Sequence, residues 1–215
     1  MSIKNNILKI KNSLPNHITL VAATKKQDIR KIQEAIDTGV KIIGENYVQE
    51  ANRKYEKIKG KVKLHLIGHL QKNKVKKAVQ IFDMIQTIDS KEIADEINTE
   101  CHKQEKNMPI LIEVNIAKEK NKKGCMPREV AELAEHIEKL SNVQLRGVMT
   151  MAPYFSNPEK SRPYFKKTRQ IFNNLKIHNP KITILSMGMS NSYQIAIQEG
   201  ATMVRIGTAI FGSRY

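Results

Sequence analysis

Short apolar runs alternate along the chain with segments in which apolar residues recur at helical spacing. A short apolar run predicts a strand that is buried on both faces, as in a parallel sheet, and the helical spacing predicts an amphipathic helix. One helix is expected before the first strand, because Ile3, Ile7, Ile10 and Leu14 form a single stripe. The pattern predicts eight strands, which fall within residues 17–25, 41–46, 63–68, 84–89, 109–116, 143–151, 182–188 and 202–212.

The order of these segments predicts the fold class. Two of the intervening helices have clear end signals, since Ser90 precedes an acidic first turn and Gly200 follows the apolar residues of 191–200. Strands that alternate with helices pair in parallel through right-handed crossovers. Eight such units predict an α/β protein, a single TIM (β/α)8 barrel domain over residues 1–215 with an extra N-terminal helix. An open doubly wound sheet is the alternative, which eight similar units favour less.

The composition is that of a globular protein with a basic surface. Hydrophobic residues make up 40% of the chain and charged residues 27%, and the formal net charge is +16. Such a charge is compatible with nucleic acid or with small anionic ligands as partners. The lysines are scattered, however, and the chain has no Trp and few other aromatic residues on which bases could stack. Nucleic acid is therefore not the expected partner.

The sequence also bears on location and on metals. No apolar run approaches the roughly 18 residues that a membrane span needs, and the first residues mix charged with apolar positions, unlike a secretory signal. We therefore expect a cytoplasmic protein that does not insert into membranes. Cys101 and Cys125 lack the C-x-x-C spacing of a zinc site, and their number and spacing suggest no disulfide framework. His65 and His69 do not share one helical face, so no metal is expected.

A TIM barrel carries its functional groups at the carboxyl ends of its strands and commonly binds phosphate after strands seven and eight. Glycine turns follow both of these runs here, and backbone N–H groups near Gly188, Gly207 and Thr208 are candidates for a phosphate cradle. Lys25 ends the first strand at the same mouth, where a lysine can form a Schiff base with an aldehyde cofactor. Arg205 interrupts the apolar run of the eighth strand, and a buried guanidinium requires a partner.

Several blocks occur in order from about Leu20 onward: LVAATK, IGENYVQE, HLIGHLQKNK, VNIAKEKNKKG, RGVMTMAP, LSMGMS and GATMVRIGTAIFG. In these blocks the chain resembles the pyridoxal 5′-phosphate (PLP) homeostasis proteins, relatives of the alanine racemase barrel domain. The resemblance implies a barrel that binds PLP as a Schiff base on Lys25 and has no known turnover. It also implies that Arg205 points at the pyridine nitrogen and keeps this nitrogen unprotonated.

The same resemblance implies roles for further residues. The family often has a second lysine two positions after the first, where this chain has Gln27, and we expect Lys26 on the opposite face of the strand. Residues implied at the phosphate are Ser186, Ser190, Gly207 and Thr208, and residues implied at the ring pocket are Asn46 and His65.

Two other functions stay open at this point. One is a small PLP-dependent amino-acid racemase, which needs acid/base groups on both faces of the cofactor. In alanine racemase a second domain and a partner subunit complete the opposite face, and we expect no such domain within these 215 residues. The other is an RNA-binding protein that uses the basic surface, whose binding would depend steeply on salt.

Overall fold

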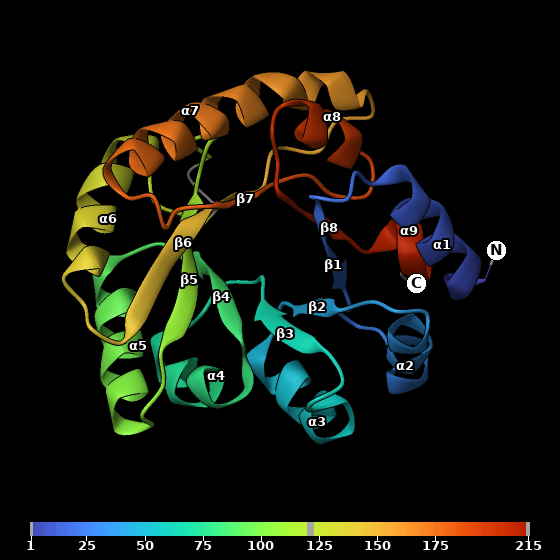
Figure 1. The fold of residues 1–215 in the computed structure, drawn as a ribbon, viewed down its shortest axis with the longest axis horizontal. Helices are drawn as coiled ribbons and strands as arrows, with labels where there is room; N and C mark the ends of the chain where they lie inside the picture. The colour runs from blue at the N-terminus through green and yellow to red at the C-terminus, as the bar shows by residue number, and fades with distance from the viewer. Residues whose placement is uncertain (1, 120–122, 214–215) are drawn as a thin grey trace.

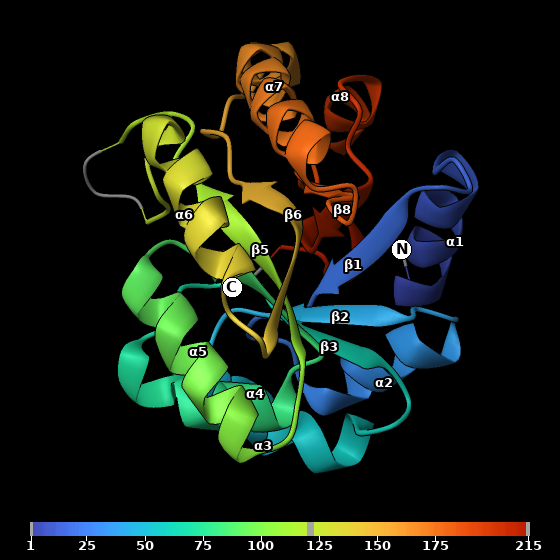
Figure 2. The ribbon, with the colours of Figure 1, turned by 60° about the vertical axis from the view of Figure 1, so that its left-hand side comes forward.

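A closed barrel of eight parallel strands forms the centre of the protein in the computed structural model, which describes residues 2–119 and 123–213. The strands follow one another in chain order, and β8 pairs with β1 to close the barrel. The helices lie around its outside (Figure 1, Figure 2). The fold is therefore the predicted TIM barrel. The strands are β1 (Thr19–Ala23), β2 (Ile42–Glu45), β3 (Lys63–Leu66), β4 (Met84–Ile88), β5 (Met108–Val114), β6 (Val143–Thr150), β7 (Ile184–Ser186) and β8 (Met203–Ile206).

The helices connect successive strands, and the extra N-terminal helix α1 packs against α2 and α9. The side-chain amide of Asn6 in α1 donates a hydrogen bond to the Ile210 carbonyl in α9 at 2.9 Å. The helices are α1 (Ile3–Ser13), α2 (Ile29–Asp37), α3 (Val48–Ile58), α4 (Val75–Ile81), α5 (Lys91–Lys103), α6 (Val130–Glu138), α7 (Arg162–His178), α8 (Tyr193–Gln198) and α9 (Thr208–Phe211). Short 3-10 turns, η1 (Lys72–Lys74), η2 (Pro127–Glu129) and η3 (Pro158–Ser161), precede α4, α6 and α7.

The two predicted helix-end signals are confirmed. At the start of α5 the Ser90 hydroxyl accepts a hydrogen bond from the Ile93 backbone N–H at 3.4 Å. Just after α8, Gly200 takes a left-handed φ of +90°, which glycine adopts without strain. The cap at Ser90 thus marks the start of α5, and the left-handed Gly200 marks the end of α8 before the chain turns into β8.

The side chains of the strands divide between the barrel interior and the layer under the helices. On β8, Met203 joins an interior cluster, whereas Val204 and Ile206 join the large cluster between strands and helices. Because side chains alternate along a strand, Arg205 points into the barrel. The interior apolar clusters are Val21, Ile67 and Met203 on one side and Met84, Leu111 and Met149 on the other.

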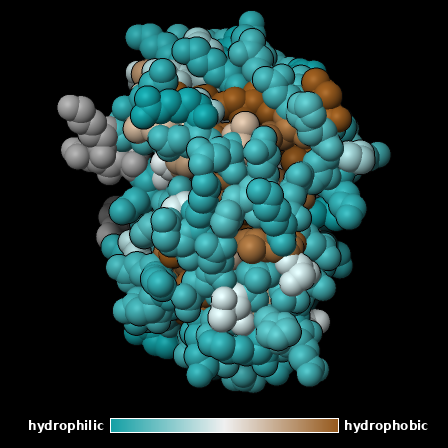
Figure 3. All heavy atoms as spheres, turned by 90° about the vertical axis from the view of Figure 1, so that its left-hand side faces the viewer, coloured by the Kyte–Doolittle hydropathy of each residue, from teal (hydrophilic) through white to brown (hydrophobic). Residues whose placement is uncertain are grey.

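The outer surface is polar over most of the face that Figure 3 shows, and apolar residues are confined to small areas of it. This agrees with a chain that carries a formal net charge of +16. Within the described residues, no helix is both long enough and apolar enough to cross a membrane.

Candidate functional site

Lys25 lies half-buried in the turn after β1, at the carboxyl end of the barrel strands. Its Nζ atom is 5.2 Å from the centroid of the Tyr47 ring, within range of a cation–π contact. The strand ends at Ala23, and Lys26 is exposed with a left-handed φ of +59°. The prediction that Lys26 lies on the opposite face of the strand is therefore wrong, because the backbone has already left the strand. Gln27 follows and is buried.

Arg205 faces two oxygen acceptors inside the barrel and is only 4% exposed. Its Nη1 donates to the Ser186 hydroxyl at 2.6 Å, and its Nη2 donates to the Thr150 carbonyl at 2.8 Å. Burial lowers the pKa of the guanidinium to about 10, while the Glu113 carboxylate acts in the opposite direction. Arg205 is therefore a charged side chain at neutral pH, and its hydrogen bonds offset part of the cost of burying the charge.

Gln86 extends these hydrogen bonds across the barrel interior. The Ser186 hydroxyl donates to Gln86 Oε1 at 2.8 Å, and Gln86 Nε2 lies 3.0 Å from His65 Nδ1. Because the amide nitrogen of Gln86 can only donate, His65 Nδ1 accepts this hydrogen bond. Burial lowers the pKa of His65 to about 3, so its ring is neutral and carries its proton on Nε2. Gln86 is not among the residues predicted for the site, although a glutamine within the apolar run 84–89 is a visible signal in the sequence.

The turns after β7 and β8 contact each other, as the barrel predicts. The Ser190 hydroxyl accepts hydrogen bonds from the backbone N–H groups of Gly207 and Ala209, at 3.3 and 3.2 Å. Gly188 has a φ of +91°, and a Cβ there would lie 2.6 Å from a side-chain carbon of α8, so this turn requires glycine. Thr208 is exposed at the start of α9.

The structure thus separates the predicted residues into two groups around the mouth, with Lys25 and Asn46 on the loops after β1 and β2. Ser186 belongs to the interior group, because its hydroxyl contacts Arg205 and Gln86. Its predicted contact with a phosphate, like the other predicted cofactor contacts, stays a prediction. The interior group is His65, Ser186 and Arg205, and the group at the two glycine turns is Gly188, Ser190, Gly207 and Thr208.

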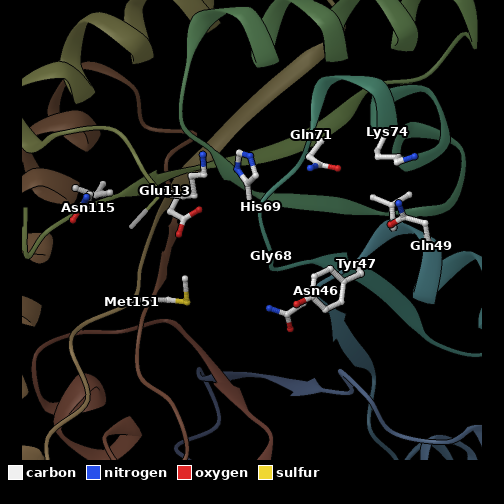
Figure 4. Close-up of a pocket in the computed structure, with 13 residues that line it drawn as sticks. Asn46, Tyr47, Gln49, Gly68, His69, Gln71, Lys74, Glu113, Asn115 and Met151 are labelled. Carbon is white, nitrogen blue, oxygen red and sulfur yellow. The ribbon is translucent and has the colours of Figure 1, made fainter. Parts of the chain in front are cut away.

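A pocket of about 540 Å³ opens at the mouth beside Tyr47 (Figure 4). The loops after β2, β3, β5 and β6 line it, and Asn46 is the predicted residue that contributes to it. Two of these loops approach each other closely at Gly68, where a Cβ would lie 2.3 Å from the Asn46 carbonyl oxygen. Glycine at this position makes the close approach possible. Its lining residues are Asn46, Tyr47, Val48, Gln49, Gly68, His69, Gln71, Lys74, Glu113, Val114, Asn115, Lys123 and Met151.

Glu113 is a buried acid in the wall of this pocket, 3% exposed, and Figure 4 shows its carboxylate turned toward the opening. Burial and the negative charge of Asp89 raise the pKa of Glu113 to about 7, against the opposing charge of Arg205. It is therefore a group that titrates near neutral pH. Glu113 is not among the predicted site residues either, although it lies within the apolar run 109–116.

No cluster of three or more His, Cys, Asp or Glu side chains suited to a metal ion occurs in residues 2–119 and 123–213. His69 instead lies with its Nδ1 3.6 Å from a carboxylate oxygen of Asp89. Cys101 and Cys125 are buried free thiols, and burial raises their pKa values to about 11 and about 12. Both thiols are therefore uncharged at neutral pH.

The fold and the site together define a TIM-barrel protein with a lysine and a buried arginine at one mouth, beside two glycine turns. Over residues 1–215 the chain matches the model of the family described as "Alanine racemase, N-terminal domain", and it belongs to this family.

The matched relatives include proteins of the kind that the sequence blocks resemble. The chain is 43% identical over 201 residues to the "Pyridoxal phosphate homeostasis protein" of Aquifex aeolicus, which covers 93% of this chain and 88% of that protein. Among solved structures, PipY of Synechococcus elongatus PCC7942 is similar without PLP, at a TM-score of 0.93 and 32% identity. PipY with PLP bound gives a TM-score of 0.88 and 31% identity, and each match covers 98% of this chain and 100% of PipY. The resemblance is therefore confirmed.

Proposed function

We propose that this protein binds PLP covalently through Lys25 and serves PLP homeostasis without catalysing a reaction of its own. The pairing of β1 with β8 carries the proposal, because Val21 pairs with Arg205 and Lys25 follows the end of β1. A lysine amine and a buried guanidinium thus lie at one mouth. The relatives support this function, since the Aquifex protein carries that name and one PipY structure contains PLP. We also propose that the protein is cytoplasmic and that residues 1–215 form a single barrel domain.

The residues at the mouth fit PLP, which combines a phosphate, a pyridine nitrogen and an aldehyde. The backbone N–H groups of Gly207 and Ala209 converge on one oxygen, that of Ser190, and such a donor pair also suits a phosphate oxygen. The glycine turn at Gly188 leaves no room for a side chain where it meets α8. When bound, PLP supplies an aldehyde that condenses with a lysine amine, and Lys25 is the residue we assign to it.

Arg205 is the residue that we assign to the pyridine nitrogen. A guanidinium has only hydrogen-bond donors, so a ring nitrogen that faces it accepts a hydrogen bond and stays unprotonated. The Ser186 hydroxyl and the Thr150 carbonyl hold two of its nitrogens and fix the plane of the group. An unprotonated ring withdraws electrons weakly, which favours holding the cofactor over turnover.

Borohydride trapping followed by peptide mapping tests the proposal. We expect protein mixed with PLP to gain a visible absorbance band, and reduction to label Lys25. Lys25→Ala should abolish this label. Lys26→Asn is the matched control, because Lys26 is the exposed neighbour and asparagine tolerates its left-handed backbone. Labelling that persists in Lys25→Ala, or that is lost in Lys26→Asn alone, would contradict the assignment.

A small amino-acid racemase is the second candidate, and Glu113 is the observation that favours it. An acid in the pocket wall with a pKa of about 7 suits a general acid or base. Incubation of the PLP-loaded protein with L-alanine and other L-amino acids in deuterated water separates the two functions. We expect α-proton exchange no faster than with free PLP. Rapid, saturable exchange that disappears in both Lys25→Ala and Glu113→Gln would establish an enzyme instead.

A further inference from the structure

Lys54, on α3 outside the barrel, is a nearly buried cation held by three oxygen atoms. Its Nζ lies 2.8 Å from Glu45 Oε1 and 2.7 Å from Glu50 Oε1, and it donates to the Thr24 carbonyl at 3.3 Å. The Lys54 side chain is 12% exposed, and that of Glu45 is fully buried. Lysine is rarely buried unless it is paired, so this arrangement is specific rather than a solvated helix face.

Both acids that hold Lys54 also hold a residue next to Lys25. Glu45 Oε1 accepts a hydrogen bond from the Thr24 hydroxyl at 2.7 Å. Glu50 Oε1 accepts one from the Lys26 backbone N–H at 2.6 Å. The residues before and after Lys25 are therefore tied to the same cation from outside the barrel.

This attachment bears directly on where the Lys25 side chain points. Lys26 has a φ of +59°, a conformation that a non-glycine residue holds only when its surroundings fix it. The Glu50 carboxylate fixes it through the Lys26 N–H, and Lys54 fixes that carboxylate. Without these contacts the turn has no reason to keep the left-handed residue, and its relaxation would rotate Lys25 relative to the mouth.

We propose that Lys54 is a positioning residue for Lys25, acting through Glu45 and Glu50 to hold the turn from Thr24 to Lys26 in the shape that presents the Lys25 amine to the mouth. The proposal rests on the proposed function only for the assignment of Lys25 as the attachment residue. It gives a role to a buried ion network that lies outside the cofactor contacts described above.

Two probes separate positioning from general support of the site. PLP reports covalent attachment, through the rate of the absorbance change on mixing with cofactor-free protein and the borohydride label at Lys25. Pyridoxine 5′-phosphate carries an alcohol in place of the aldehyde, so it reports binding of the ring and phosphate without attachment. The variants are Lys54→Met, which removes the cation, and Lys54→Arg, which keeps it. Lys57→Met is the matched control, because Lys57 is an exposed lysine one turn further along α3.

Lys54→Met should slow attachment of PLP by about tenfold, since small displacements of a reacting group cost this much or more. The affinity of Lys54→Met for pyridoxine 5′-phosphate should equal that of the wild-type protein. Lys54→Arg should recover most of the rate of PLP attachment, and Lys57→Met should attach PLP at the wild-type rate. If Lys54→Met does not fold with its unpaired buried carboxylate, Lys54→Met with Glu45→Gln carries the test. Attachment of PLP to Lys54→Met at the wild-type rate, or a loss of affinity for pyridoxine 5′-phosphate as large as the loss of attachment rate, would overturn the role of Lys54. Absence of any Lys25 label in the unchanged protein would contradict the proposed function itself.

Discussion

Arg205 Nη1 donates a 2.6 Å hydrogen bond to the hydroxyl of Ser186, on the neighbouring strand inside the barrel. The same hydroxyl donates to Gln86 Oε1, so a single serine connects the buried cation to the amide that faces His65. A side chain that both accepts and donates in this position has no apolar substitute. Ser186 therefore holds the interior group together, whether or not it also meets a phosphate.

Ser186→Ala should destabilise the protein. The substitution leaves one Arg205 nitrogen and the Gln86 oxygen without these partners inside the barrel, which costs about 2 kcal/mol of the free energy of unfolding. Urea unfolding followed by circular dichroism measures this change. Ser156→Ala is the control, because Ser156 is exposed in the loop after β6. An equal effect of the two substitutions would mean that the hydrogen bonds of Ser186 contribute nothing.

Glu113→Gln should change how stability depends on pH. The pKa of Glu113 is raised from 4.5 to about 7 in the folded protein, so the folded state binds a proton more tightly than the unfolded state. The contribution of this carboxyl is therefore fully present below pH 4.5 and is lost as the pH rises through 7. The unfolding free energy of the wild-type protein minus that of Glu113→Gln should therefore fall by about 3 kcal/mol between pH 4.5 and pH 7.

Urea unfolding at several pH values between 4.5 and 8 measures this gap. Glu135→Gln is the matched control, since Glu135 is an exposed acid on α6 and its gap should stay nearly constant. A Glu113→Gln gap that does not vary with pH would show that the acid is not desolvated as the structure has it.

His65→Gln should change the pH dependence of stability in the opposite direction to Glu113→Gln. The pKa of His65 falls from 6.5 to about 3 on burial, so the unfolded state binds the proton more tightly. The contribution of the neutral ring is present above pH 6.5 and is lost as the pH falls toward 3, by about 5 kcal/mol in total. The stability advantage of the wild-type protein over His65→Gln should therefore shrink as the pH falls from 6.5 to 3. His17→Gln is the control, because His17 is exposed, and it should show a much smaller change. A widening advantage at low pH would contradict the burial of a neutral ring.

The phosphate should account for a large part of cofactor affinity. Charge-assisted hydrogen bonds from backbone N–H groups are strong, so PLP should bind at least about a hundredfold more tightly than pyridoxal, which lacks the phosphate. Isothermal titration of Lys25→Ala with both compounds measures binding without covalent attachment. Thr208→Ala should narrow the difference, because Thr208 begins α9 beside the two N–H groups bonded to Ser190. Equal affinities for the two aldehydes would rule out a phosphate site at these turns.

The order of strands and helices was predictable from the sequence because each strand is an apolar run and each run is bounded by helical spacing or glycine. Arg205 was found by a simple rule, a charged residue in an apolar run, and the structure gives it the partners that the rule demands. The same rule applied to Gln86 and Glu113 points to the two interior residues that were missed. It flags the residues but not their partners, because the barrel register decides that Gln86 meets Ser186, 100 positions away.

The role of Lys54 had no such signal. Its helix also carries Arg53 and Lys57, and in sequence all three look like cations on a solvated face. Only the contact of α3 with the turn after β1 separates Lys54 from its neighbours. The early end of β1 was equally hidden, since the left-handed backbone of Lys26 depends on a hydrogen bond to Glu50 on another element.

The closure of the barrel between its first and last strands also has a consequence for biosynthesis. Thr19 to Ala22 pair with Met203 to Ile206, so β1 leaves the ribosome long before its partner exists. Until then one side of β1 is an open sheet edge with unpaired backbone groups, which is a template for association with other chains. Helix α1 likewise lacks its packing partner α9 until the end of the chain has been synthesised. The pairing of β8 with β1 closes this open edge and completes the mouth at the same time.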